Sequence, residues 1–226
     1  MSRLQLLQAS LAHYTASIPE GPIVNVNLIS LHGRTEEDLA ESARALLKYW
    51  RDLGKLVASS GGRALCLTYV ARSEGPQAHL HPWDLVSLVY YPSLGHYRNI
   101  MEADAFLTIK HLRRASVKQS VLYAAALAGP LAELERIVTN RPFAVDVRLN
   151  NATMVDNDTE TVGLQGIVLL VGNASYFPWK HFVVSSSGSA SPTALLRVVP
   201  FDGAEESIAR IVAKVWPSRA QQLSNL

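Results

Sequence analysis

The sequence predicts an α+β fold in which two helices cover one face of a four-stranded antiparallel sheet. The first observation behind this prediction is the order of patterns through Ala126, which runs strand, helix, strand, strand, helix, strand. The second is the composition: 48% of the 226 residues are hydrophobic and 18% are charged, as in a globular chain with a substantial core. Together these observations indicate a ferredoxin-like antiparallel sheet.

The first predicted strand covers residues 23–31, IVNVNLISL. Side chains alternate across a strand, so Asn25 and Asn27 share one face and Val24, Val26 and Leu28 share the other. A buried amide without a partner costs roughly 1 to 3 kcal/mol, so two neighbouring ones are unusual in a core strand. We therefore expect both asparagines to meet water, a ligand or polar neighbours.

A helix is predicted from Thr35 to Val57. Thr35 and Asp38 have the spacing of a capping box, and residues 59–62 end the helix. A second strand follows over residues 64–71. Apolar residues recur along one face of the helix at three- and four-residue steps, which predicts that this face is buried: Leu39, Ala43, Leu46, Leu47, Trp50, Leu53 and Val57.

The third strand begins at Trp83 and ends at Pro92, which lacks an amide hydrogen and cannot continue a central ladder. Ser93 can cap the long helix that follows. The apolar spacing of that helix predicts a break near residues 103–104. Residues 120–126, SVLYAAA, are the fourth strand.

A motif runs through this second half of the unit. A Trp-Asp pair opens a strand that ends in Pro-Ser, the helix carries a Met and then an Asp followed by an aromatic residue, and an Arg-x-Ala pattern leads to a Ser and the last strand. The motif resembles that of the dimeric α+β barrel superfamily, in particular its poorly characterised small-domain branch of unknown function. The chain departs at Leu112 and Gln119, where the branch usually has His and Asp. The matching residues are Trp83, Asp84, Pro92, Ser93, Met101, Asp104, Phe106, Arg113, Ala115 and Ser120.

The resemblance implies a sheet that pairs with a second sheet to form a barrel. Relatives in the superfamily include cofactor-independent monooxygenases, lactone isomerases and cyclases that act on small, largely apolar metabolites. Some members bind haem through one histidine, and nothing in this sequence singles out such a ligand.

We divide the chain into a ferredoxin-like domain with an N-terminal amphipathic helix (1–128), a linker helix (129–142) and a remainder (143–226). The remainder ends in a strand that stops at Pro200 and a helix, which repeats the arrangement around Pro92. Two interpretations remain open. The remainder is either a diverged second unit, which makes the fold a tandem, pseudo-dimeric α+β barrel, or an elaboration on a domain that dimerises.

A pocket is expected on the sheet face that the helices leave free. We assign the faces of Val24, Val26, Val86 and Leu88 to the helices, so the opposite face lines the barrel with apolar walls, amides and hydroxyls. The alternative is an interface whose polar atoms satisfy one another, and a one-residue slip in register would exchange the faces. The predicted ligand-binding residues are Asn25, Asn27, Thr68, Ser87, Tyr91 and Tyr123.

The candidate catalytic residues are His111 and His96, both on the second helix. Neutral imidazole titrates near working pH and can act as a general base, while a helix-surface or capping role is the alternative for each. His79 and His81 share a loop, but the local sequence supplies no third metal ligand, so no metal is expected.

Two functions follow as hypotheses. The first is a cofactor-independent enzyme of monooxygenase, isomerase or cyclase type, with a small, largely apolar metabolite in the barrel. The second is a non-catalytic ligand-binding or assembly module of the same fold. The enzyme hypothesis predicts a histidine or another base at the pocket mouth, and the module hypothesis predicts a pocket without titratable groups.

Composition limits the partners. A net charge of +2 without long basic runs argues against nucleic acid. No run approaches the ~20 apolar residues that span a bilayer, and the N-terminus lacks a signal-peptide pattern. The single cysteine, Cys66, allows no intrachain disulfide and fits a reducing compartment. We therefore expect a cytoplasmic homodimer or intrachain pseudo-dimer with a small-molecule ligand and no cofactor.

Overall fold

The computed structural model describes residues 21–74, 83–139, 142–148, 161–171, 181–186, 194–201 and 205–224. The helix predicted over residues 2–18 lies outside these ranges, as do His79 and His81. The elements, in chain order, are β1 (Ile23–Leu31), α2 (Glu36–Ser59), β2 (Arg63–Glu74), β3 (Leu85–Tyr91), α3 (Leu94–Glu102), α4 (Asp104–Ser116), β4 (Val117–Ala128), α5 (Leu131–Val138), β5 (Phe143–Arg148), β6 (Thr161–Val171), β7 (His181–Ser185), β8 (Ala194–Pro200) and α6 (Glu205–Ser224).

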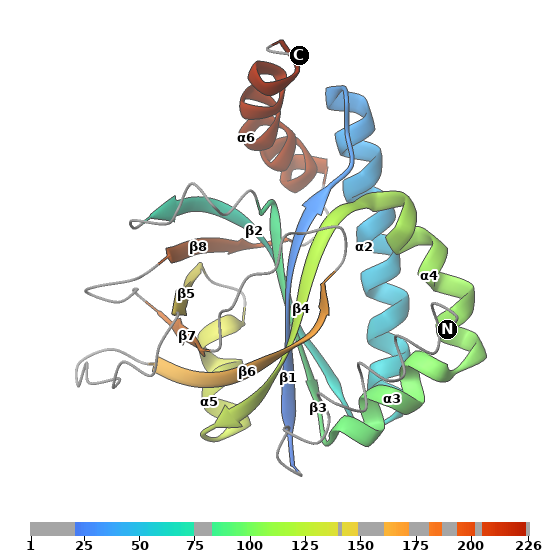
Figure 1. The fold of residues 1–226 in the computed structure, drawn as a ribbon, viewed down its shortest axis with the longest axis vertical. Coiled ribbons are helices and arrows are strands. Elements are labelled where there is room, and N and C mark those ends of the chain that lie inside the picture. Colours follow the sequence, from blue (N-terminus) through green and yellow to red (C-terminus); the bar gives the residue numbers. More distant parts are fainter. Residues whose placement is uncertain are drawn as a thin grey trace.

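The described strands close into an antiparallel barrel with the order β1-β3-β2-β8-β5-β7-β6-β4 (Figure 1). The four strands from the first half of the sequence lie side by side in the order β4-β1-β3-β2, and the four from the second half lie in the order β8-β5-β7-β6. In each half the fourth strand lies beside the first, followed by the third and the second. Of the two interpretations that the sequence left open, the structure therefore supports the tandem α+β barrel. The domain limits stay predictions, and α5 falls within the segment assigned to the linker.

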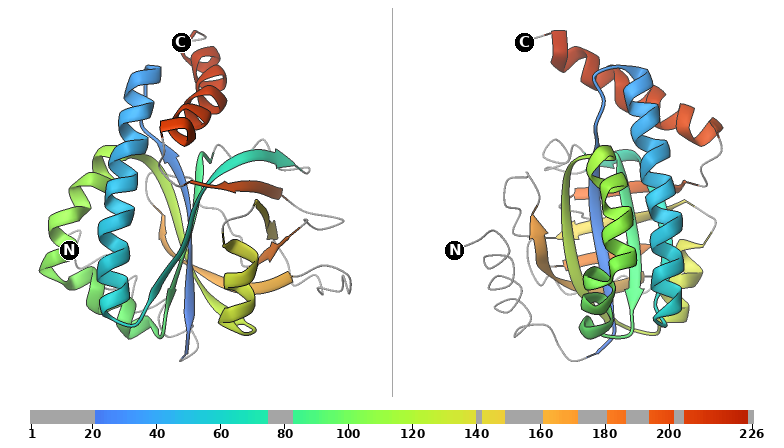
Figure 2. Two further views of the ribbon diagram at one scale, coloured as in Figure 1. Left: turned by 180° about the vertical axis from the view of Figure 1, so that it is seen from behind. Right: turned by 90° about the vertical axis from the view of Figure 1, so that its right-hand side faces the viewer.

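The helices lie mainly on one side of the barrel. Figure 1 shows α2, α3 and α4 together beside β1 and β3, and Figure 2 shows α2 and α4 running next to each other over the strands. Helix α6 packs against the upper end of α2. The apolar side chains of α5, Leu134, Ile137 and Val138, pack with the inward-facing residues of the strands in one buried cluster, the barrel cluster. None of the described helices is long and apolar enough to cross a membrane.

The apolar residues of β1 divide between two clusters. Val24, Val26 and Leu28 point into the barrel, where they pack with Tyr123 and with residues of the second half such as Val145. The other face of β1 meets α2, α3 and α4 through a second cluster. The barrel interior thus joins both halves of the chain in one apolar core.

The predicted assignment of faces was wrong for β1 and β3. Val26 lies opposite Tyr123 and Asn27 opposite Leu122, so the valine face, and not the asparagine face, lines the barrel. The error has a physical cause: β1 and β3 are covered on both sides, and both of their faces are largely apolar. Such strands carry a weak signal for which face meets the helices.

Local chemistry explains where the first helix begins and ends. Thr35 Oγ1 accepts a hydrogen bond from Asp38 N at 3.1 Å, and Asp38 Oδ2 accepts one from Thr35 N at 3.0 Å, which confirms the capping box. Arg34 N also donates to Asp38 Oδ2 at 3.0 Å, and this bond, together with those to Thr35, holds the pKa of the Asp38 carboxyl below its usual range. Gly61, just past the helix, takes a φ of 79°, which a side chain would strain.

The break in the second helix is confirmed. Ala103 has extended backbone, with a ψ of 138°, and separates α3 from α4. Ser93 caps α3 by accepting a hydrogen bond from His96 N at 3.4 Å, and its Oγ lies 2.8 Å from His96 Nδ1. The imidazole of His96 therefore contacts the capping residue in the first turn of α3.

Asp84, the residue before β3, is hydrogen-bonded to the C-terminal end of β1. Its Oδ2 accepts hydrogen bonds from Leu31 N at 2.7 Å and from Ser30 Oγ at 3.3 Å, at the point where the pairing of β1 with β4 shifts register. Its backbone N donates to Ile29 O at 2.8 Å. Both members of the Trp-Asp pair are buried, so this part of the motif serves the fold.

We expect Thr35→Ala to lower the free energy of unfolding by roughly 0.5 to 2 kcal/mol, because the substitution leaves an amide at the start of α2 without its acceptor. Urea unfolding followed by far-UV circular dichroism measures the loss. Thr35→Ser keeps the acceptor and should stay close to wild type. Equal losses in both variants would contradict the capping role.

Cys66 packs against the barrel cluster, and burial raises the pKa of its thiol to about 12. Since the thiolate is the reactive form, we expect the folded protein to react with Ellman's reagent at neutral pH on the order of a hundredfold or more slower than the unfolded chain. The raised pKa also means that the neutral thiol favours the folded state, and that this contribution declines as pH rises above the ordinary thiol pKa. Rapid labelling of folded protein would contradict this placement.

Candidate functional site

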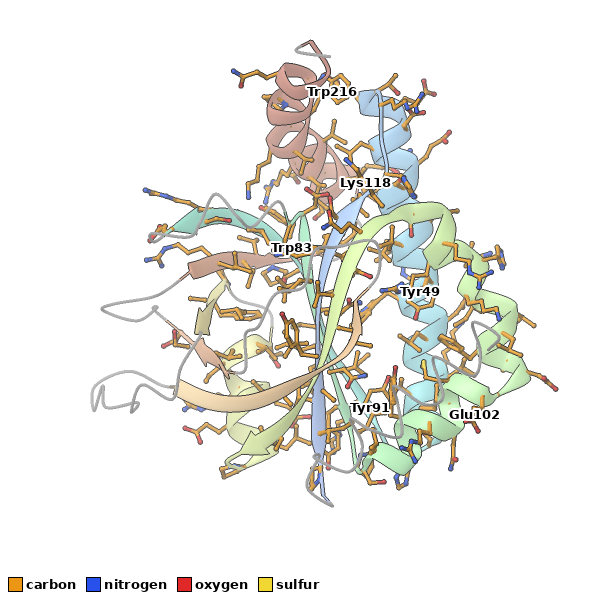
Figure 3. The ribbon with its side chains drawn as sticks, in the orientation of Figure 1. Tyr49, Trp83, Tyr91, Glu102, Lys118 and Trp216 are labelled. Atoms are coloured by element: carbon orange, nitrogen blue, oxygen red, sulfur yellow. The ribbon has the colours of Figure 1, made fainter. Side chains whose placement is uncertain are left out.

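The candidate site is a cavity of about 420 Å³ between the helix-facing side of the sheet and helices α2, α3 and α4. Figure 3 shows Tyr49 and Tyr91 in this layer, while Trp83 lies on the barrel side of β1. The volume falls in the range of small-molecule sites. Its lining residues come from seven elements: Asn25, Asn27, Ile29, Leu46, Tyr49, Trp50, Leu53, Leu67, Ser87, Val89, Tyr91, Tyr97, Met101, Phe106, Lys110, Arg113, Arg114 and Leu122.

The sheet side of the cavity carries amide and hydroxyl groups among apolar residues. Asn25 and Asn27 lie two residues apart on β1, and Asn27 pairs in register with Ser87 of β3. Asn25 is 3% exposed and Ser87 is 2% exposed. The Oδ1 atoms of both asparagines are buried and have no hydrogen-bond partner within the part of the chain that the structure describes. A tightly packed core does not tolerate such acceptors cheaply, since each costs about 1 to 3 kcal/mol.

The walls are largely aromatic. The rings of Tyr91 and Tyr97 meet edge to face with centroids 5.3 Å apart, and those of Tyr49 and Phe106 do so at 6.5 Å. Burial raises the pKa of the Tyr97 hydroxyl to about 12 and also raises the pKa values of the Tyr49 and Tyr91 hydroxyls. These hydroxyls therefore stay neutral at pH 7 and can donate hydrogen bonds to a ligand.

One edge of the cavity is cationic. Lys110, Arg113 and Arg114 line it from the C-terminal half of α4, and Arg114 is the most exposed of the three. Arg113 is held in place because its Nη2 donates to Ser120 Oγ on β4 at 2.8 Å. Its charge opposes the rise in the pKa values of the Tyr49 and Tyr97 hydroxyls, which line the same cavity.

The structure brings four of the predicted ligand-binding residues together: Asn25, Asn27, Ser87 and Tyr91 all line the cavity. The other two lie elsewhere. Thr68 Oγ1 donates to Val86 O at 3.0 Å within the sheet, and Tyr123 is fully buried in the barrel cluster. Four of the six predicted residues thus gather on the helix side of the sheet, whereas Tyr123 lies inside the barrel.

Neither candidate histidine is among the lining residues. His96 sits at the start of α3 beside Ser93 Oγ. His111 is exposed on α4, where its Nδ1 lies 2.7 Å from Thr108 O of the preceding turn. The alternative stated for both residues, a capping or helix-surface role, describes these positions.

Sequence analysis missed the aromatic and cationic lining from the helices. Arg113 and Arg114 lie in the last turn of α4, where cations also offset the negative end of the helix dipole. The available signal was the spacing of Phe106, Lys110 and Arg113, which places them on one face of α4 at steps of four and three residues. Among the described residues no group of three or more His, Cys, Asp or Glu side chains could hold a metal ion.

We expect Asn25→Leu to raise the free energy of unfolding of the ligand-free protein, by about 1 kcal/mol, because it replaces an unsatisfied buried acceptor with an apolar group of similar size. Thr68→Val is the matched control in the same sheet. It removes a satisfied hydrogen bond and should lower stability by about 0.5 to 1.5 kcal/mol. Urea titration measures both, and a large destabilisation by Asn25→Leu would show that its amide serves the fold.

No protein-family model matches the chain, and no curated protein matches it. Solved structures with similarity include the methylated RPA0582 protein, with 24% identity, a TM-score of 0.42 and coverage of 58% of this chain and 95% of the other. Another is the RPA0582 protein of unknown function from Rhodopseudomonas palustris, with 23% identity, a TM-score of 0.41 and coverage of 57% and 96%. A "putative monooxygenase" from Lactobacillus acidophilus shows 10% identity, a TM-score of 0.39 and coverage of 92% and 89%. At these TM-scores the similarities carry no information about function.

Proposed function

We propose that the protein binds a small, largely apolar organic molecule in the cavity between its sheet and helices α2, α3 and α4. The observation that carries this proposal is the pair of buried Oδ1 atoms of Asn25 and Asn27, which lack partners among the described residues. Both atoms belong to side chains that line the cavity, so a ligand there can supply the missing hydrogen bonds. The apolar and aromatic walls supply the rest of the binding surface.

Binding fits the lining better than acid–base catalysis does. The described lining residues include no histidine, aspartate or glutamate. The hydroxyls of Tyr91 and Tyr97 have raised pKa values, so they are poor bases at neutral pH. His111, the base proposed from the sequence, is exposed on α4 and hydrogen-bonded within its own helix.

Cofactor-independent catalysis is the second candidate, and one observation favours it. Arg113 lines the cavity together with the neutral hydroxyls of Tyr49 and Tyr97, and such a group of donors can stabilise negative charge that develops on a substrate oxygen. A reaction of the monooxygenase, isomerase or cyclase type would use this stabilisation. Turnover would appear as a change in the mass or the absorption spectrum of the bound molecule.

We expect the neutral fluorophore N-phenyl-1-naphthylamine to bind the protein, with a blue-shifted emission, because the cavity is apolar on most sides. Met101→Trp places a larger side chain in the lining and should weaken binding by about tenfold or more. Met101 suits this test because it is only half-buried and its flexible side chain tolerates replacement.

The control for this experiment is Leu107→Trp, which adds the same ring at an exposed position of α4 outside the lining. It should bind the fluorophore as the wild type does. Equal binding by both variants would place the fluorophore elsewhere and contradict the proposal.

A further inference from the structure

We propose that the ligand is a small organic anion with one six-membered ring, which carries a carboxylate at one end and a hydroxyl at the other. This inference rests on the proposed function, since it concerns the same cavity. It follows from three features of the lining: where its positive charge lies, where its unsatisfied amides lie, and how far apart they are.

The carboxylate end is set by Lys110, Arg113 and Arg114. None of the three forms an ion pair with a carboxylate in the described part of the chain, although Arg and Glu elsewhere do so, as Arg44 and Glu205 show at 2.8 Å. The hydrogen bond from Arg113 to Ser120 fixes the guanidinium and leaves most of its five N–H donors available. A fixed guanidinium fork matches a carboxylate in two parallel hydrogen bonds.

The helix dipole accounts for only part of this arrangement. Cations in the last turn of α4 offset the negative end of the dipole, which explains Arg113 and Arg114 as surface groups. It does not explain why Lys110, one turn earlier, lines the same cavity, nor why no described acidic residue does. An uncompensated positive edge beside aromatic walls is suited to an anion with an apolar body.

The hydroxyl end is set by Asn25 and Asn27. A carboxamide presents an acceptor oxygen and a donor nitrogen, and a hydroxyl both donates and accepts. A ligand hydroxyl can therefore donate to one of the two buried oxygens and accept from a carboxamide nitrogen. A carboxylate has no proton to donate, so at this end it would leave both unpartnered oxygens without a donor, and we place the charge at the other end.

The strand register gives the spacing between the backbone positions that carry the two ends. Asn27 lies opposite Leu122, and Ile29 lies opposite Ser120, whose Oγ binds Arg113. Two residues along β1 span about 7 Å, because a strand rises about 3.4 Å per residue. One ring with substituents at opposite positions covers such a span, and the edges and faces of Tyr91, Tyr97 and Phe106 offer it aromatic contacts.

Isothermal titration calorimetry with para-hydroxybenzoate, its methyl ester and benzoate tests the inference. We expect the wild type to bind para-hydroxybenzoate about tenfold more tightly than the ester, which lacks the charge. Arg113→Gln should remove this difference, and Asn27→Leu should remove the advantage of para-hydroxybenzoate over benzoate. Should Arg113→Gln fail to fold, Arg114→Gln replaces an exposed residue and should reduce the same difference.

Lys118→Gln is the matched control, since Lys118 is an exposed cation on β4 outside the lining. Figure 3 shows it above Tyr49 and Tyr91, and its variant should bind all three compounds as the wild type does. Equal affinity for acid and ester would overturn the anion inference and leave the proposed function standing. Binding of N-phenyl-1-naphthylamine without binding of any benzoate would do the same, whereas no binding of any of the four compounds would overturn both.

Discussion

The closed pairing of the barrel is the constraint on which the rest of the structure depends. A four-stranded sheet in the order β4-β1-β3-β2 leaves β4 and β2 with unpaired backbone groups at its edges. The second half of the chain pairs with both, through β6 on β4 and β8 on β2. Pairing in this way turns one face of the first sheet toward the second half, and the described side chains there form a shared apolar core. The other face is left to the helices, and it is there that the cavity lies.

The cavity lies where the helix-facing side of β1 carries polar residues, although buried strand faces are normally apolar. Between Ile23 and Ile29 that face carries Asn25 and Asn27, while the barrel face stays apolar throughout. Two amides without partners favour a gap that a polar group can enter, and large side chains from α2, α3 and α4 surround this gap without filling it. Buried polar groups without hydrogen-bond partners lower the stability of the fold. Proteins therefore retain them mainly at sites where they serve a function.

Much of the fold could be predicted from local chemistry. The capping box at Thr35 and the break near Ala103 follow from residue types at short spacing. What failed depends on contacts distant in sequence. Strand β7 went unpredicted between an aromatic segment and a serine-rich loop, although it completes the repeated order. The side of β1 that meets the helices is fixed only by its register with β4. Four residues of the motif, Asp84, Ser93, Arg113 and Ser120, form hydrogen bonds within the fold, and among these four only Arg113 also lines the cavity.

A crystal structure of protein purified from its native host tests the central claim most directly. The account predicts ligand density on the helix side of β1, within hydrogen-bond distance of Asn25 or Asn27 and bounded by the aromatic residues of α2, α3 and α4. A ligand inside the barrel beside Tyr123 would contradict it. So would a structure in which the two carboxamides bond to neighbouring side chains and the space above them is closed.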